Sequence, residues 1–587
     1  MDNFPVVDRR ASISKNRVRW LGVSTPIEDY AFLSNRRSAA LVSRDGSMDW
    51  LCLPRFDSPA IFAAILGTPA HGRWQISIRG AEPTQRRYRT GTLTLETLWE
   101  SETGAALVTD VMTPPGFAVD VVRQVQCLRG SVTVDNDFRP TADYGLWPIY
   151  PEHDRTLYVT GNFATTISLQ AGEELQWTIS ATFPESDEPE DQADPVSAIE
   201  AADRIWGPQG ADEKEGISLL VLEGLIHAET GGMVAAPTAS LPELFGGGRN
   251  WDYRYTWLRD SAFSIEVLVR HGYISAAKRW RKWLRKTLQD LPEDLQIMYG
   301  IDGEMELPER VIDHLPGYEN SAPVRVGNGA AEQYQADVAG EVMLALGKLR
   351  EAGIKESKKS WKMQRKLIDY VLKNWDRRDH GIWEMRGELH YFTHGRVMMW
   401  AALDQAIRAC EDYGLEGDVE LWRERREMLR DEILTRGIGE YGGFVQTYDG
   451  SEVDASLLQI PMTGFVPADH PVMLKTVEKI EDDLVDKHGF VYRYRTEAGF
   501  DGLEGHEYPF LICAFWLVEQ YAASGRLDDA EALYERLISV STDLGLLAEE
   551  YDPVDGRLAG NFPQAFSHLG VVRAIDAIRI ARGEPLN

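Results

Sequence analysis

Two segments far apart in the sequence each set a carboxylate beside an aromatic ring. The first is Gly381–Glu384 (GIWE), and the second is Leu547–Asp552 (LAEEYD). One carboxyl group that keeps its proton and another that gives it up form the minimum equipment for hydrolysing a glycosidic bond. The residue types therefore indicate a general acid and a general base.

The two segments suit different roles. Glu384 directly follows Trp383, and a carboxyl group packed against an indole loses hydration, so it tends to stay protonated as a general acid must. Read alone, it would be a surface glutamate in a loop. Glu549 and Glu550 are adjacent, so only one of them can easily face a cavity, where a general base must be ionised and hold a water molecule.

A third segment, residues 250–260, packs four aromatic and four charged side chains into eleven positions just before a predicted helix. This density predicts the wall of a sugar-binding pocket. In that wall, Arg259 and Asp260 would hold hydroxyl groups, and Tyr253 and Trp257 would shape the cavity. The alternative is a helix cap with a buried arginine–aspartate pair.

Further candidates are single residues. Arg325, within Pro323–Asn328, could bind a hydroxyl group, and Glu507, which precedes an apolar helix, could be a ligand or a cap. Gly246–Gly248 lacks the ending of a phosphate-binding loop. No His, Asp or Glu spacing indicates a catalytic metal, and no cofactor is expected.

The elements that must position these residues fall into two groups. Short runs of alternating apolar and polar residues, bounded by Gly, Pro and Asp, predict an antiparallel β-sandwich over residues 1–185. Residues 186–211 form an acidic linker. From residue 212 to 587 the hydrophobic period is helical.

About twelve helices are predicted in this second region. They could close into a toroid of six α-hairpins, an (α/α)6 barrel, or form an open solenoid; the long loops that carry the motifs favour the toroid. The predicted helices are 214–228, 260–271, 273–290, 331–352, 357–375, 394–414, 418–436, 455–464, 469–484, 507–524, 527–545 and 564–582.

Composition restricts the partners. The chain has 587 residues and a formal net charge of −30, which disfavours nucleic acid and an anionic membrane surface as partners. No apolar run is long enough for a membrane span, and the four cysteines show no metal-binding or redox spacing. A cytoplasmic enzyme acting on a small carbohydrate is expected, and a homo-oligomer is compatible with the sequence.

Taken together, these motifs resemble glycoside hydrolase family 15, the family of glucoamylases and bacterial trehalase-like proteins. Residues 26–30, 46–52 and 54–58 resemble the N-terminal β domain of its bacterial and archaeal members. Pro237–Glu243, the block at 251–260, Leu295–Gly300, Trp383–Glu384 and Asn561–His568 resemble its catalytic toroid.

The resemblance implies roles for individual residues. It makes Glu384 the general acid and Glu549 the general base of an inverting hydrolase, and it makes Arg259 and Asp260 the pair that holds the non-reducing glucosyl unit. Tyr253, Trp257 and Trp383 would line the same subsite. Met385 and Tyr508-Pro509 depart from the family pattern on the leaving-group side, which bears on the substrate.

The sequence therefore predicts an inverting, exo-acting α-glucoside hydrolase that releases β-glucose. Trehalose is slightly favoured as the substrate over maltose, isomaltose and short α-glucans. A disaccharide phosphorylase with the same architecture is one alternative, although it would not need Glu549. A non-catalytic carbohydrate-binding protein is the other.

Overall fold

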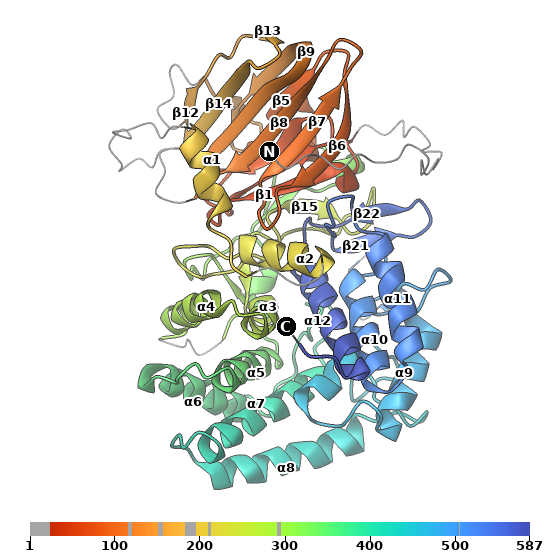
Figure 1. Cartoon of the computed structure of the whole chain (residues 1–587). Coiled ribbons are helices and arrows are strands. Elements are labelled where there is room, and N and C mark those ends of the chain that lie inside the picture. Colours follow the sequence, from red (N-terminus) through yellow and green to blue (C-terminus); the bar gives the residue numbers. More distant parts are fainter. Residues whose placement is uncertain are drawn as a thin grey trace.

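The structure is a computed structural model, and it describes residues 24–114, 120–150, 157–181, 195–208, 213–289, 295–499, 501–503 and 505–586. A β domain packs on a larger helical domain (Figure 1). The predicted order of an antiparallel β domain followed by a helical barrel is confirmed. The acidic run at 185–191 and the segment Met1–Trp20 lie outside the described residues.

Twelve strands form one antiparallel network in the β domain. The first part of this network runs from β1 to β9 and contains seven strands: β1 (Tyr30–Ser34), β2 (Ala39–Ser43), β3 (Ser47–Cys52), β4 (Ala60–Phe62), β5 (Arg73–Ile78), β13 (Thr166–Gln170) and β9 (Val121–Arg139). The others continue it: β8 (Gly104–Met112), β7 (Leu95–Glu100), β6 (Glu82–Tyr88), β14 (Glu174–Ala181) and β12 (Leu157–Thr160).

The long strand β9 joins the two parts of this network. Its first half pairs with β8 and β14, and its second half pairs with β5 and β13. The sequence predicted a sandwich of two sheets. In the structure the two layers are joined into one sheet, because both layers pair with β9. Alternating side chains such as those of Trp74 and Trp177 are fully buried between the layers.

Local sequence sets individual turns of this sheet. Asp45-Gly46 forms the turn between β2 and β3, where the Gly46 amide donates to the Ser43 carbonyl. Gly46 has a φ of +82°, and a Cβ atom there would lie 2.0 Å from the carbonyl oxygen of Ile76. Only glycine fits such a position.

The predicted linker contains a helix, α1 (Pro195–Asp203). Its Ala198, Ile199 and Ala202 pack on Val111 and Val122 of the sheet. This short helix is therefore part of the β domain. The sequence missed it because the neighbouring residues are acidic.

The helical domain closes into a ring. Six inner elements of the described chain contact one another in sequence, and the last, α12, returns to the first, α3. They are α3 (Leu258–Arg270), α5 (Val338–Glu351), α7 (Thr393–Glu411), η6 (Ala455–Thr463), α10 (Leu511–Ala523) and α12 (Ala565–Arg582). The closed ring excludes the open solenoid.

An outer layer of helices covers the ring. It consists of α2 (Glu213–Gly224), α4 (Ile274–Thr287), α6 (Lys358–Lys373), α8 (Val419–Arg436), α9 (Pro471–Leu484) and α11 (Leu527–Ser539). Helices α4 and α6 are amphipathic, with buried tryptophans on one side and lysines on the other. In contrast, α10 is buried on nearly all sides, as an inner helix must be.

Several predicted helices differ in type or in their bounds, including α2 and α11, which end at Gly224 and Ser539, earlier than predicted. Residues 455–463 form a 3-10 helix rather than an α-helix, and Pro461, which lacks an amide hydrogen, lies inside it. Helix α5 begins at Val338 and α10 at Leu511, later than predicted. The residues before them are loops that reach the centre of the barrel.

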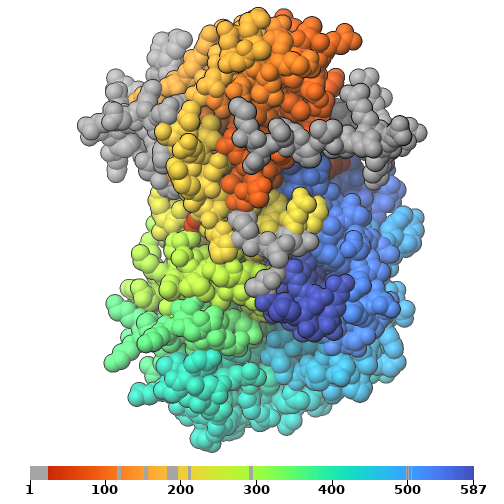
Figure 2. Space-filling model, viewed as in Figure 1, coloured from red at the N-terminus to blue at the C-terminus, as the bar shows by residue number. Residues whose placement is uncertain are grey.

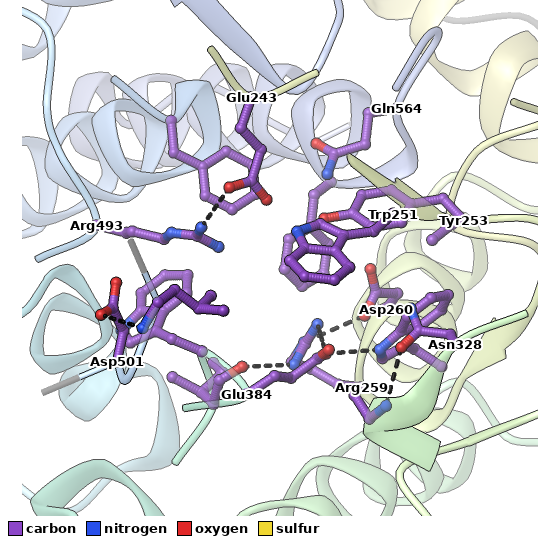
Figure 3. A pocket seen from close by; sticks show the side chains of 18 of the residues that line it. Glu243, Trp251, Tyr253, Arg259, Asp260, Asn328, Glu384, Arg493, Asp501 and Gln564 are labelled. Atoms are coloured by element: carbon purple, nitrogen blue, oxygen red, sulfur yellow. Dashed lines mark hydrogen bonds and ion pairs between the residues drawn. The ribbon is translucent and has the colours of Figure 1, made fainter. Parts of the chain in front are cut away.

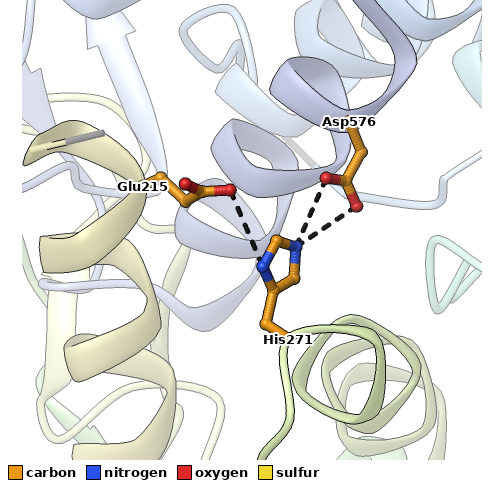
Figure 4. A group of neighbouring side chains, drawn as sticks. All are labelled: Glu215, His271 and Asp576. Atoms are coloured by element: carbon orange, nitrogen blue, oxygen red, sulfur yellow. Dashed lines mark hydrogen bonds and ion pairs between the residues drawn. The ribbon is translucent and has the colours of Figure 1, made fainter. Parts of the chain in front are cut away.

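A buried cluster fixes the C-terminal end of α3 (Figure 4). His271 lies between Glu215 of α2, with 3.6 Å from Nδ1 to the carboxylate, and Asp576 of α12, with 3.3 Å from Nε2. Arg579 and Arg270 bind the same two carboxylates. The N-terminal end of α3 carries Arg259 and Asp260, so this cluster holds the helix that positions them.

The β domain supports the loop that precedes α3. Buried Arg254 forms an ion pair with Asp252 at 2.7 Å and donates to the carbonyl of Ser58 and the hydroxyl of Tyr144 in the β domain. The indole of Trp50 donates to the carbonyl of Pro237. In the space-filling view the β domain lies directly above the helical domain (Figure 2).

Candidate active site

A cavity lies at the N-terminal ends of the inner helices. Its wall residues come from the segments directly before α3, α5, α10 and α12 and from the loop before α7. The polar and aromatic members are Glu243, Trp251, Tyr253, Trp257, Arg259, Asp260, Asn328, Trp383, Glu384, Arg386, Arg493, Tyr494, Asp501, Phe510, Gln564 and Phe566 (Figure 3). Most of the sequence-predicted site residues therefore lie together.

Glu384 lies at the bottom of this cavity in Figure 3. Its Oε1 accepts a hydrogen bond from Nε1 of Trp257 at 2.7 Å and lies 3.5 Å from Nη2 of Arg259. The backbone of Glu384 has a φ of +60°, which is rare for a residue other than glycine. Strained backbone conformations cluster at active sites, although six other non-glycine residues in the described ranges also have a positive φ.

The sequence predicted that Glu384 would pack against the indole of the preceding residue, Trp383. The structure shows that the indole in contact with Glu384 is that of Trp257. Trp383 turns away and donates to Oδ2 of Asp454 at 2.9 Å. Its ring packs against Trp516 and Phe510. Because successive side chains point in different directions, sequence neighbours need not touch.

Arg259 and Asp260 form the predicted pair, with 3.1 Å between Nε and Oδ2. The guanidinium of Arg259 also donates to the carbonyl of Ile382 and lies over the ring of Phe566. Burial, partly offset by Arg259, raises the pKa of Asp260 to about 6. Both side chains are thus held in one orientation at the cavity wall.

Glu549 lies behind Tyr253. The hydroxyl of Tyr253 donates to Oε1 of Glu549 at 2.5 Å, and the amide of Asn561 donates to Oε2 at 3.4 Å. Burial, followed by repulsion from Glu243, raises the pKa of Glu549 to about 8, while the bond from Tyr253 opposes the rise. Glu549 therefore reaches the cavity wall through Tyr253.

The neighbouring Glu550 points elsewhere. Its Oε2 accepts from the amide of Tyr508 at 3.1 Å, and the residue belongs to β21 (Glu550–Asp552). Burial and repulsion from nearby carboxylates raise the pKa of Glu550 well above its usual value. Of the two adjacent glutamates in the described chain, Glu549 is the one whose side chain hydrogen-bonds to a residue that lines the cavity.

The wall opposite Arg259 is built by residues that the sequence did not single out as site residues. Arg493 donates to Glu243 at 2.9 Å, and Arg249 binds Asp501 at 2.6 Å. The hydroxyl of Tyr494 also donates to Asp501. This wall is therefore charged and rigidly connected.

A signal for part of this wall was present in the sequence. Residues 492–495 read Tyr-Arg-Tyr-Arg, which repeats the mixture of tyrosine and arginine found at Tyr253–Tyr255. Glu243 ends the segment Pro237–Glu243, and Trp251 belongs to the block before α3. Asn328, Arg386 and Gln564 carried no comparable signal.

Two predicted substrate-binding residues do not line the cavity. Arg325 lies over Trp251, with 4.7 Å from its guanidinium carbon to the ring centre, and donates to the carbonyl of Gly248. Glu507 is buried and binds Arg493 through both carboxylate oxygens at 2.7 Å. They support Trp251 and Arg493 from behind.

Three buried carboxylates, Glu243, Glu507 and Glu550, have oxygens within 4.8 Å of one another. Arg493 already binds two of them, so a cationic group occupies this cluster. In the cluster of Glu215, His271 and Asp576, both imidazole nitrogens face carboxylates. In both clusters, arginine side chains form ion pairs with the carboxylates.

An (α/α)6 barrel with carboxyl groups held around a central aromatic pocket is an arrangement that suits a glycosidase. The profile of "Glycosyl hydrolases family 15" matches residues 218–576, and that of "Trehalase-like, N-terminal" matches residues 15–195. The chain belongs to glycoside hydrolase family 15. It is a glycoside hydrolase of the trehalase and glucoamylase type.

Its relatives cover nearly the whole chain. The trehalase of Mycolicibacterium smegmatis is 35% identical over 95% of this chain and 92% of its own length. The trehalase of Thermoplasma volcanium is 33% identical over 93% of this chain and 92% of its own length. A bacterial glucoamylase complexed with acarbose has the same fold, with a TM-score of 0.63 at 12% identity, covering 96% of this chain and 95% of that one.

No helix in the described ranges is both long and apolar enough to cross a membrane. The four cysteines, Cys52, Cys127, Cys410 and Cys513, are all free thiols.

Proposed function

We propose that this enzyme is an inverting trehalase that splits the α,α-linkage of trehalose in the pocket described above. The whole-length similarity to trehalases and the trehalase-like N-terminal domain support this substrate. Arg259 and Asp260 hold the glucosyl unit that is attacked. The other glucose, the leaving sugar, lies toward Arg493 and Asp501.

Glu384 acts as the general acid. It transfers its proton to the glycosidic oxygen as the bond from that oxygen to the anomeric carbon breaks. The hydrogen bond from Trp257 and the nearby guanidinium of Arg259 hold the carboxyl group in one orientation. After the reaction Glu384 is ionised and must take up a proton before the next cycle.

Glu549 acts as the general base. It accepts a proton from a water molecule whose oxygen forms the new bond to the anomeric carbon on the face opposite the leaving sugar. The hydroxyl of Tyr253 orients the carboxylate. One glucose therefore leaves as the β-anomer, and the other retains its α-configuration.

One observation carries this mechanism: the two carboxyl groups are held by different members of one aromatic pair. Tyr253 binds Glu549, Trp257 binds Glu384, and the two rings meet edge to face. The intervening rings keep the carboxyl groups apart. Inverting glycosidases need about 6.5–9.5 Å between them, which leaves room for a water molecule.

The product anomers test the proposal. We would incubate the purified chain with trehalose, maltose and isomaltose, with and without phosphate, and follow the reaction by proton NMR. Equal early amounts of α- and β-glucose from trehalose, with trehalose the fastest substrate, are expected. Glucose phosphate among the products would instead indicate a phosphorylase, and faster maltose cleavage would indicate a glucoamylase.

The site of action in the cell is proposed to be the cytoplasm. The four unpaired thiols favour a reducing compartment. Fractionation of the native host tests this location. Detection of the protein in the periplasmic or secreted fraction would contradict it.

A further inference from the structure

Glu243 is a buried carboxylate at the cavity wall that the mechanism does not use. It directly follows β15 (Ala239–Pro242) and is 1% exposed. Figure 3 places it across the cavity from Glu384. Its Oε2 accepts a hydrogen bond from Arg493 at 2.9 Å. The side chain of Trp251 also acts as a donor toward this carboxylate and lowers its pKa, but Oε1 accepts no hydrogen bond of normal geometry from any residue in the described ranges.

The guanidinium of Arg493, which binds Oε2 of Glu243, is itself held in place. Arg493 is itself bound through two bonds of 2.7 Å to Glu507, and Arg249 binds Glu507 from the other side. A buried acceptor without a donor is unfavourable, and more so when it is charged. A ligand that brings a hydroxyl hydrogen to Oε1 would remove this penalty.

The position of Glu243 indicates which sugar brings that hydroxyl. Arg259 and Asp260 form one wall of the cavity, and Glu384 lies beside Arg259, in the lower part of the view (Figure 3). Glu243 belongs with Arg493 and Asp501 on the other side. The glycosidic oxygen must lie beside Glu384, so the sugar beyond it lies against the wall that contains Glu243.

We propose that Glu243 accepts a hydrogen bond from a hydroxyl group of the leaving sugar and so determines specificity for a disaccharide over simple α-glucosides. This inference rests on the proposed function for the acid role of Glu384 and for the identity of the sugar as glucose. A site that binds a substrate hydroxyl with a buried polar group discriminates strongly against a leaving group that lacks the hydroxyl.

The test compares two substrates with different leaving groups. Trehalose leaves a polyhydroxylated sugar, whereas α-glucosyl fluoride leaves fluoride, which offers no hydroxyl to Glu243. We would measure kcat/KM for both with the wild type, Glu243→Gln and Glu243→Ala, each at its own pH optimum. The matched control is Glu309→Gln, because Glu309 is also paired with arginines, Arg325 and Arg386, but lies outside the cavity wall.

For the Glu243→Ala variant we expect kcat/KM for trehalose to fall between about 10-fold and 150-fold, the range for a hydrogen bond to a charged group. Turnover of the fluoride should change by less than about threefold, and the Glu309→Gln variant should resemble the wild type. Equal losses on both substrates, or no loss on either, would overturn the proposal.

Azide separates Glu243 from a general base. When a base is removed, azide can replace the activated water and restore turnover of the fluoride as β-glucosyl azide. Rescue is expected for Glu549→Ala and not for Glu243→Ala. Azide rescue of the Glu243 variant would assign it the base role and reject the inference.

Failure of the proposed function would look different. If the wild type cleaves the fluoride and maltose but not trehalose, the trehalase assignment is wrong. The role of Glu243 is then decided by the same comparison with maltose in place of trehalose.

Discussion

Tyr253 and Trp257 meet edge to face, with ring centres 5.4 Å apart, and each binds a different carboxylate. Tyr253 donates to Glu549, and Trp257 donates to Glu384. One aromatic pair, four residues apart in the sequence, therefore orients both proposed catalytic groups. A substitution of Tyr253 should therefore affect the proposed base, and a substitution of Trp257 should affect the proposed acid.

Replacing either proposed catalytic glutamate should remove most activity. Glu384→Gln and Glu549→Gln keep the size and hydrogen-bonding shape of the side chain but cannot transfer the proton. A general acid or base contributes about 10²- to 10⁴-fold. We expect kcat on trehalose to fall by that amount with unchanged circular dichroism; a variant with near wild-type turnover would exclude that residue from the role.

The aromatic pair should separate the two proton transfers. Trp257→Phe removes the hydrogen bond to the acid, so it should slow trehalose by about 10-fold or more and α-glucosyl fluoride, which needs no protonation by the acid, much less. Tyr253→Phe removes the bond to the base and should slow both substrates alike. The two kcat/KM ratios measure this, and identical ratios for both variants would contradict the assignment.

The pH dependence should show an acidic limb set by Glu549. Burial and Glu243 raise the pKa of Glu549 to about 8, and a base must be ionised, so kcat/KM should decrease as the pH falls through this value. Glu243→Gln removes the repelling charge and should move the limb to lower pH. Profiles of kcat/KM against pH for the wild type and Glu243→Gln measure the shift, and Glu309→Gln is the control. If the acidic limbs of wild type and Glu243→Gln coincide, Glu243 does not raise the pKa of Glu549.

Breaking the cluster at the end of α3 should destabilise the barrel. His271→Ala removes the side chain that bridges the buried carboxylates of Glu215 and Asp576, each of which keeps an arginine partner, and losing a buried hydrogen-bond partner costs about 1–3 kcal/mol. We expect a lower Tm in thermal unfolding. His506→Ala, which removes an exposed ion pair with Glu497, is the control and should leave Tm nearly unchanged.

Arg325 should matter less than Arg493. Arg325 supports Trp251 from behind, whereas Arg493 lines the cavity and fixes Glu243. Arg325→Ala is expected to raise KM by less than about 10-fold, and Arg493→Ala to lower kcat/KM by more than about 100-fold. Steady-state kinetics on trehalose compare the two variants. A larger loss of kcat/KM for Arg325→Ala than for Arg493→Ala would support the predicted direct contact of Arg325 with the substrate.

Much of the fold was available from the sequence. Alternating residues predicted the antiparallel strands, and the helical period predicted all twelve elements of the barrel as helices, although one of them is not an α-helix. The exception, 455–463, has the right composition but contains Pro461, which interrupts the hydrogen bonds of an α-helix. Helix α1 was missed because it is short and its neighbouring residues are acidic.

The candidate site was only half visible in the sequence. Glu384, Glu549, Arg259 and Asp260 lie in dense motifs, so their types and neighbours indicated chemistry. Glu243 and Arg493 are 250 residues apart and meet through a single ion pair. Nothing local in either segment predicts that contact.

The sequence by itself determined which segments become strands and helices, because periodicity, turns and caps depend on residues close together in the chain. It also determined the family and the candidate carboxylates. Tertiary structure alone decided that α12 closes the ring on α3, that Trp257 and not Trp383 contacts Glu384, and that Glu549 and not Glu550 meets Tyr253. These outcomes depend on side-chain direction and on packing between distant segments, which no local pattern encodes.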